Sequence, residues 1–284
     1  MKNGLTMTAV FEAESANYGE GMGNITTLKK LNRGAGDGYT YISRQALRYS
    51  LIQQLEWDNT PVEKSGSGDK TVVQFQPSAS IADYPEIDFF GYMKTEKKKN
   101  AATRSAVCRL SNAISLEPYT SDLDFLTNMG LARRIDADNA IAQSEIHKSF
   151  YAYSITIDLD RVGEDGEVSI PDSEKAQRTE TLLRGFEFLY RDIKGRRENL
   201  SPLFVIGGLY ERKNPYFENR IQLNKGNLNT RMLLDAAEPV KTESKVGYIS
   251  GTFANDKEIK DSFQPVTVAE FFNWLTGQVR ERFA

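Results

Sequence analysis

The sequence is poor in the residues on which many metal sites and hydrolases depend. Its 284 residues include one cysteine, Cys108, and one histidine, His147. A single cysteine excludes an internal disulfide and a cysteine-rich zinc cluster, and it fits a reducing cytoplasm. A single histidine excludes a multi-histidine metal site, and any Ser–His–Asp or Cys–His arrangement would have to use it. We therefore predict no metal ion and no cofactor, and a structural, solvent-facing role for His147.

Long apolar runs are also missing. No stretch approaches the roughly 20 residues that a membrane helix needs. The apolar residues 5–11 are too short for a secretory signal and are followed at once by Glu12. With 39% hydrophobic and 26% charged residues, the chain can still bury a core. We expect a globular, cytoplasmic protein with no membrane partner.

Excess positive charge is absent as well. The net charge is −3, which argues against a protein that coats nucleic acid without specificity, because phosphates repel an acidic surface. The basic residues are clustered, however. Residues 94–109 hold six of them against Glu96, and residues 191–197 hold four against Asp192. Two interpretations stay open for both clusters: solvated loops and helix faces, or tracks for phosphates.

Hydrophobic patterning predicts an α+β sheet domain. Strands are expected at residues 5–11, 87–93, 149–159, 203–210 and 246–253. Helices are expected at residues 44–55 with Ser43 as N-cap, 103–116, 172–193 and 268–283. Glycine-rich loops are expected at residues 18–24 and 33–38. Two stretches interrupt this order, a polar excursion at 57–85 and an acidic stretch at 117–148, for which an exposed hairpin and an arm are both open. The strands and helices alternate in a ferredoxin-like manner.

Few residues suggest catalysis. Asp37 lies on a glycine-flanked loop and is the one acidic residue that we keep as a catalytic candidate. Gly19, Gly21 and Gly23 form GxGxG, which is not the GxGxxG fingerprint of a dinucleotide site, although such glycines can expose backbone amides to a polyanion. We therefore predict a binding protein and not an enzyme.

Two segments have the chemistry of phosphate binding. Residues 43–45 place a hydroxyl, a guanidinium and unpaired amides at a predicted helix start. Residues 195–197, Gly-Arg-Arg, combine a flexible backbone with two guanidinium groups. Each segment has a simpler alternative, namely a capped helix and an ordinary basic loop.

At these residues the sequence resembles a known family, the backbone subunit of type I CRISPR surveillance complexes (the Cas-seven family), and within it the type I-B, DevR-like branch. The resemblance runs in order along almost the whole chain, and its most specific blocks are residues 11–13, 17–21, 41–48, 88–93 and 121–127.

The resemblance implies a hand-shaped molecule. An RRM-like palm would comprise residues 1–56, 86–116 and 149–284, with fingers at about 57–85 and a thumb at about 117–148. Copies of the chain would stack along a CRISPR RNA within a Cascade complex, next to other Cascade subunits. The complex would recognise target DNA through pairing with the guide.

The resemblance also implies RNA-binding residues. Those expected on the palm are Asn17, Ser43, Arg44, Gln45 and Arg48. Apolar wedges between bases are expected at Met93 and Leu126, with Thr127 beside the second. A loop that meets the guide is expected at Gly195, Arg196 and Arg197. The basic stretch would add Lys94, Lys97, Lys98, Lys99 and Arg104.

Two alternatives to this function stay open. The first is a type III-like backbone subunit that cleaves target RNA with Asp37. The second is a lone transcriptional or RNA-processing regulator, which would be a monomer or dimer whatever the length of the RNA.

Overall fold

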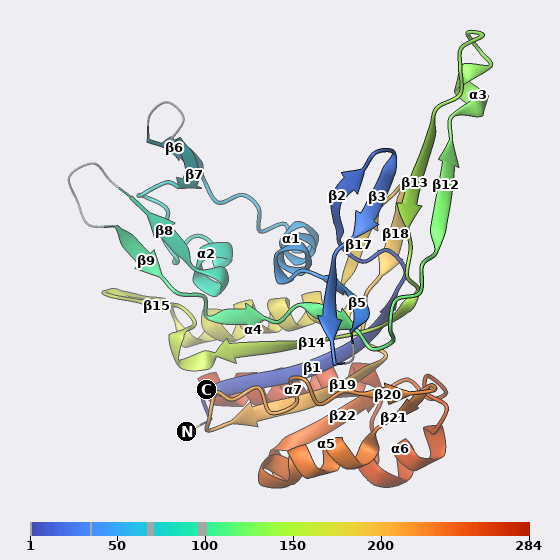
Figure 1. Cartoon of the computed structure of the whole chain (residues 1–284). Coiled ribbons are helices and arrows are strands. Elements are labelled where there is room, and N and C mark those ends of the chain that lie inside the picture. The colour runs from blue at the N-terminus through green and yellow to red at the C-terminus, as the bar shows by residue number, and fades with distance from the viewer. Residues whose placement is uncertain (1, 35, 67–70, 96–100) are drawn as a thin grey trace.

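An antiparallel sheet runs through the centre of the protein (Figure 1). The computed structural model describes residues 2–34, 36–66, 71–95 and 101–284. The strands of the sheet follow the order β22 (Ser244–Tyr248), β19 (Phe204–Tyr210), β1 (Gly4–Ala13), β14 (Ser149–Asp158), β11 (Ala113–Ser115), β5 (Asp37–Ile42) and β4 (Lys30–Arg33), and β10 (Cys108–Leu110) also pairs with β14. The predicted α+β class is confirmed.

Strand β1 is the central strand of this sheet. It pairs antiparallel with β14 on one side and with β19 on the other, so that Leu5 lies opposite both Ile157 and Leu209. Its alternation of apolar and β-branched residues suits a strand with both faces covered. The strands predicted at 5–11, 149–159 and 203–210 are therefore confirmed.

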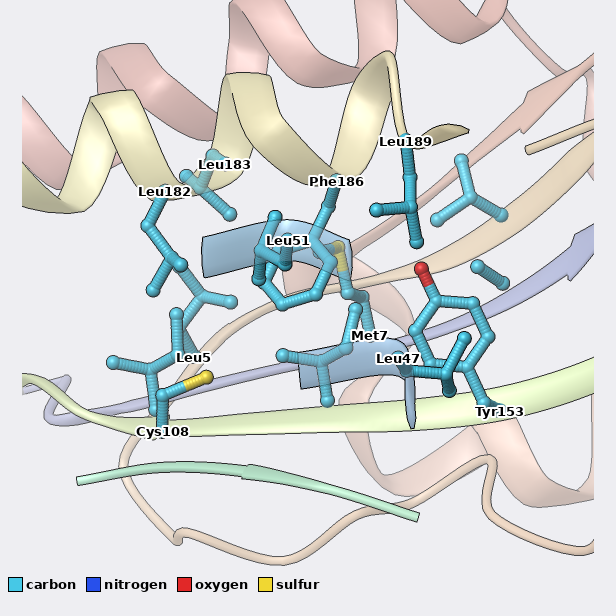
Figure 2. Close-up of a cluster of buried hydrophobic side chains, with 14 of the residues drawn as sticks. Leu5, Met7, Leu47, Leu51, Cys108, Tyr153, Leu182, Leu183, Phe186 and Leu189 are labelled. Carbon is cyan, nitrogen blue, oxygen red and sulfur yellow. The ribbon is translucent and has the colours of Figure 1, made fainter. Parts of the chain in front are cut away.

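Three helices cover one face of the sheet. They are α1 (Arg44–Gln54), α4 (Asp172–Glu187) and α7 (Val268–Phe283). Figure 2 shows Leu5 and Met7 of β1 facing Leu51 of α1 and Phe186 of α4, with Tyr153 of β14 beside them. All of these side chains are at most 1% exposed. Burial of such side chains contributes about 1.5–3 kcal/mol each, which makes this layer the main core.

A C-terminal lobe covers part of the other face. Its elements are β20 (Leu223–Asn224), β21 (Asn227–Leu228), α5 (Thr230–Ala237), η3 (Glu238–Glu243) and α6 (Asp256–Phe263). Val10, Phe204 and Ile206 point from the sheet into this lobe and pack there with Phe253 and Ile259. The sheet is therefore apolar on both faces where the lobe lies.

The stretch 117–148 forms a long arm that projects from the sheet, and we call it the thumb arm (Figure 1). It consists of β12 (Leu123–Thr127), α3 (Met129–Ala132) and β13 (Ile141–Glu145). The residues predicted as a glycine-rich loop instead form a hairpin of β2 (Tyr18–Met22) and β3 (Ile25–Leu28), and β3 pairs in parallel with β13. The loop prediction was wrong because this pairing with the distant β13 was not visible in the local sequence.

Two further hairpins project on the other side of α1, and we call them the finger hairpins (Figure 1). They are β6 (Val62–Ser65) with β7 (Val72–Phe75), and β8 (Tyr92–Lys94) with β9 (Ala102–Arg104); the short helix α2 (Pro85–Phe90) lies between them in the chain. The prediction of a strand at 87–93 was wrong for residues 87–90, which belong to α2, and right for Tyr92 and Met93, which belong to β8. Pro85 at the first helical turn, followed by Glu86 and Asp88, favours a helix start there.

The helix predicted at 103–116 was also wrong. The stretch forms the end of β9 and the strands β10 and β11, both paired with β14. Val107, Leu110 and Ala113 have helical spacing, but they lie beside the long apolar strand β14, and strand pairing overrides the local pattern.

The helix predicted at 172–193 ends earlier. Helix α4 stops at Glu187, and β17 (Tyr190–Ile193) then pairs with β18 (Arg196–Asn199). The helix predicted at 268–283 is confirmed, with Thr267 and Glu270 forming a capping box. The small elements η2 (Leu159–Arg161), β15 (Glu164–Asp165) and β16 (Val168–Ser169) connect β14 to α4. None of the helices in the described part of the chain has the length and apolarity that a membrane crossing requires.

His147 is buried where the thumb arm returns to the sheet, so the prediction of a solvent-facing residue was wrong. Its side chain is 9% exposed, and its Nδ1 lies 2.7 Å from Oγ1 of Thr40. The rings of Tyr119 and Tyr151 pack edge-on against the imidazole. Burial lowers the pKa of His147, against the opposing charge of Glu117. These contacts join the end of the thumb arm to β5 and β14.

A buried carboxylate joins the finger hairpins to the sheet domain. Asp88 is 0% exposed and accepts a hydrogen bond from Arg104 Nη2 at 2.7 Å. It also accepts the Gly163 amide at 3.0 Å, and Arg178 of α4 lies 3.5 Å away. Removing one member of such a buried network leaves the others uncompensated.

We expect Asp88→Ala to lower the free energy of unfolding by about 3–5 kcal/mol, because two buried guanidinium groups lose their partner. Urea denaturation followed by circular dichroism measures this change. Asp83→Ala, at an exposed position in the same segment, should stay within about 0.5 kcal/mol. Equal stabilities of the two variants would contradict the role assigned to Asp88.

Candidate nucleic-acid interface

The start of helix α1 is built by two asparagines from distant segments. Asn17 Oδ1 accepts hydrogen bonds from the Ser43 amide at 3.2 Å and the Ser43 hydroxyl at 2.6 Å. Asn112 Oδ1 accepts the Arg44 amide at 2.9 Å, and Ser43 Oγ caps the Ala46 amide. The helix start predicted at 43–45 is confirmed, but the amides of Ser43 and Arg44 are not unpaired as expected. Asn17 and Ser43 position α1, and the exposed chemistry lies in the side chains that follow.

Four side chains in the first two turns of α1 face solvent, and we call Arg44, Gln45, Arg48 and Tyr49 the α1 stripe. All four are exposed. Positions four apart share a face of a helix, so Arg44 lies above Arg48 and Gln45 above Tyr49. Arg48 also lies over the ring of Phe90, 5.7 Å from its centroid. Three of the residues predicted for the palm are therefore brought together at the surface.

Three hollows meet at the α1 stripe. Arg44 lines a hollow of about 570 Å³ on the sheet, the sheet hollow. Arg48 lines a hollow of about 350 Å³ against the finger hairpins, the finger hollow. Tyr49 lines a hollow of about 560 Å³ against the hairpin of β17 and β18, the hairpin groove. Helix α1 thus forms a ridge between the finger hairpins and the thumb side of the molecule (Figure 1).

The sheet hollow gathers positive charge that the sequence did not reveal. Arg33 and Arg109 line it together with Arg44. Arg109 is bound at 2.8 Å to Asp158, and although burial alone would raise the pKa of that carboxyl, the contact with Arg109 lowers it overall. Arg33 and Arg44 are exposed. Glu218 also lines the hollow and, together with Asp158, offsets part of this positive charge, so that the exposed Arg33 and Arg44 are the groups open to an anion.

The predicted loop 195–197 lies at the tip of the β17–β18 hairpin. Lys194 and Gly195 have positive φ angles of 50° and 75°, as a tight hairpin turn requires. Arg196 is bound to Glu14 at 3.1 Å and to Glu198 at 3.2 Å, so that much of its charge is already paired. Arg197 is exposed but forms an ion pair with Asp192.

Two members of the predicted basic stretch are internal. Lys94 and Arg104 are each 6% exposed. Lys94 donates to the carbonyl of Ala79, and Arg104 is held by Asp88. Their assignment as RNA contacts is corrected, because neither ammonium nor guanidinium reaches the surface. The predicted contacts Lys97, Lys98 and Lys99 lie outside the described residues.

The predicted apolar wedges are both exposed but lie on different arms. Met93 is 63% exposed on a finger hairpin, and Leu126 is 70% exposed on the thumb arm beside the exposed Thr127. Within one chain they do not meet at one site, since the two arms project on opposite sides of α1 (Figure 1).

Asp37 lies exposed at the start of β5, in a further hollow that Arg33 also lines. Across the described part of the chain, no group of three or more His, Cys, Asp or Glu residues is arranged to hold a metal ion.

Sequence reasoning missed Tyr49, Asn112 and Arg33, and it placed Arg109 in a basic cluster without assigning it to the RNA contacts. For Tyr49 a signal existed, because it lies one turn after Gln45 on a predicted helix. For Asn112 and Arg33 there was none, since their places depend on how distant strands pair.

Chains with this fold occur in solved structures of CRISPR RNA-guided surveillance complexes. A chain of a "CRISPR RNA-guided surveillance complex, pre-nicking" superposes with a TM-score of 0.65 and 12% identity, covering 97% of this chain and 100% of that chain. A second chain, from a "CRISPR RNA-guided surveillance complex", gives a TM-score of 0.61 and 13% identity over 97% and 99% of the two chains. At these identities the likeness establishes the fold.

The sequence comparison is more specific. The profile of the family described as "CRISPR-associated negative auto-regulator DevR/Csa2" matches residues 5–225, and the chain belongs to this family. The "CRISPR-associated protein Cas7/Cst2/DevR" of Myxococcus xanthus (strain DK1622) is 27% identical over 159 residues, which are 50% of this chain and 52% of the relative. The chain thus spans about half the length of that curated relative. The predicted resemblance to the Cas-seven backbone subunits is confirmed.

Proposed function

We propose that the protein is a non-catalytic backbone subunit of a type I, I-B-like CRISPR Cascade complex. It binds the CRISPR RNA along its backbone and supports RNA-guided recognition of target DNA. The observation that carries the proposal is the α1 stripe, where Arg44 and Arg48 are exposed one turn apart and hollows open on either side.

The RRM-like palm belongs to this proposal. It is supported by the order β19–β1–β14–β10, in which β1, α1, β10, β14, α4 and β19 follow one another along the chain. This is the order of a ferredoxin-like β-α-β-β-α-β unit. The finger hairpins and the thumb arm are then insertions in the connections of one compact core.

Backbone binding suits a protein that must accept any guide sequence. Guanidinium groups bind phosphate oxygens without regard to the base, so affinity comes without sequence preference. Sequence recognition then passes to base pairing between the guide and its target. The local charge of the α1 stripe and the sheet hollow supports this in spite of the acidic net charge.

Assembly of copies along the RNA is supported by exposed apolar side chains on both arms. The thumb arm exposes Phe125, Leu126, Met129, Leu131, Ile135 and Ile141. The finger hairpins expose Val62, Val72, Val73 and Met93, most of which line the finger hollow. Exposed apolar surface of this extent marks an interaction site. We propose that the thumb arm of one copy reaches the adjacent copy, with Leu126 and Met93 as wedges between bases.

The proposed partners follow from this arrangement. They are the CRISPR RNA, further copies of the chain, other Cascade subunits, and target DNA held through the guide, and the proposed location is the cytoplasm.

We expect Arg44→Glu to weaken binding of a single-stranded guide RNA about tenfold or more, because a hydrogen bond to a charged group contributes about 1.5–3 kcal/mol. The slope of log affinity against log salt should fall by about 0.7, since one phosphate contact is lost. Fluorescence anisotropy at several salt concentrations measures both. Arg231→Glu makes the same charge change at an exposed position in the C-terminal lobe and should bind as the wild type does. Equal affinities for the two variants would contradict the palm assignment.

We expect the mass of the complex to grow with the length of the guide RNA, and Ile135→Asp, at an exposed apolar position of the thumb arm, to abolish this growth by placing a charge in the contact between copies. Size-exclusion chromatography with light scattering measures the mass with and without RNA. Ile249→Asp, at an exposed apolar position outside both arms, is the matched control. A wild-type protein that stays a monomer or dimer with full-length guide would instead support the regulator suggested by the description of the family.

We expect no cleavage when the assembled protein is incubated with complementary RNA and Mg²⁺, because the proposed role is structural. Gel analysis of end-labelled target RNA is the measurement. Regularly spaced cuts that disappear in Asp37→Ala would establish the type III-like nuclease in place of the non-catalytic subunit.

A further inference from the structure

The hairpin groove has a composition unlike that of the other two hollows. It lies between α1 and β17, and three tyrosines line it: Tyr18, Tyr49 and Tyr190. Ala16 and Ala46 line it as well, and such short side chains leave room between the rings. Its volume of about 560 Å³ is in the range of sites for small organic ligands.

Within the described part of the chain, two of the three tyrosine rings are covered by a cationic side chain, and the third is not. Lys194 lies 4.6 Å above the ring of Tyr18, and Arg197 lies 4.3 Å above the ring of Tyr190. Tyr49 is 67% exposed, and within the described residues its ring has neither an aromatic nor a cationic neighbour. The groove therefore offers one open aromatic face.

The polar side chains of the groove are largely committed to bonds within the protein. Gln54 donates to the Gly185 carbonyl at 3.3 Å and accepts the Tyr190 amide at 3.1 Å. Gln53 donates to Asp58 at 2.8 Å. Asn17 is held by Ser43, and Ser50 donates to the Ala46 carbonyl. A planar ligand would find a stacking surface here, with few groups to read the edge of a base.

We propose that the hairpin groove binds one nucleobase of the single-stranded RNA, stacked on Tyr49. This inference rests on the proposed function. It adds that a base of the bound RNA turns toward the side of α1 that faces β17. Positions 48 and 49 point about 100° apart around a helix, so phosphates bound by Arg44 and Arg48 place a base over Tyr49. Stacking on an aromatic ring tolerates every base, which suits a subunit that accepts any guide.

The test uses Tyr49→Ala and Tyr49→Phe of the full chain with three probes of equal length: oligouridine, oligoadenosine and an abasic ribose-phosphate oligomer. For both base-containing probes, Tyr49→Ala should lose about 5- to 150-fold in affinity, the range for stacking of one base. Tyr49→Phe should bind within about twofold of the wild type, because the ring is retained. On the abasic oligomer the wild type and Tyr49→Ala should bind alike.

Failure of this inference differs from failure of the proposed function. If Tyr49→Ala binds both base-containing probes as the wild type does while Arg44→Glu binds them weakly, the base site is wrong and the palm assignment stands. A loss in Tyr49→Ala that persists on the abasic oligomer would also overturn stacking. If the wild type binds no probe at all, the proposed function fails and the base site fails with it. Thermal melts confirm that both variants are folded.

Discussion

The short segment that leaves β1 holds the parts of the interface in their relative positions. The amides of Glu14 and Ser15 donate to one oxygen of the buried Glu198 carboxylate, at 2.8 and 3.3 Å. The next contact along the segment is the pair of hydrogen bonds from Ser43 to Asn17. One extended stretch thus fastens the β17–β18 hairpin and the start of α1 to the end of the central strand. The end of β1 is itself held by its pairing with β14, in which Ala13 lies opposite Ser149.

Some cationic residues of the protein are buried in ion pairs, and others are exposed on the α1 stripe. Arg191 is bound to Glu198 at 2.6 Å, and Arg104 to Asp88 at 2.7 Å, all of them buried. Such pairs define geometry more than they add stability, because the desolvation of both charges offsets much of their attraction. The exposed guanidinium groups of the α1 stripe keep their hydration and can exchange water for phosphate. Burial, and not the number of positive charges, therefore decides which basic residues are available to a nucleic acid.

Local patterns were sufficient where one amphipathic element packs on one surface. The helix that begins after Ser43 follows from a cap and an apolar stripe, and the helix at 268–283 follows from its amphipathic pattern. The same reasoning failed for residues 103–116, whose helical spacing of apolar residues lies in strands beside β14. It also failed for Lys94, because a lysine in a basic run gives no sign that a carbonyl of a distant turn receives it.

The sequence by itself determined the family, the α+β class, the main strands of the sheet and the presence of an arm at 117–148. These depend on periodicity and on short blocks of residues, which are local properties. Only the tertiary structure decided which predicted contacts are exposed, that the amides of Ser43, Arg44 and Ala46 are already paired, and that a groove between α1 and β17 opens beside Tyr49. These depend on side chains that meet from segments far apart in the chain, and no local pattern encodes such meetings.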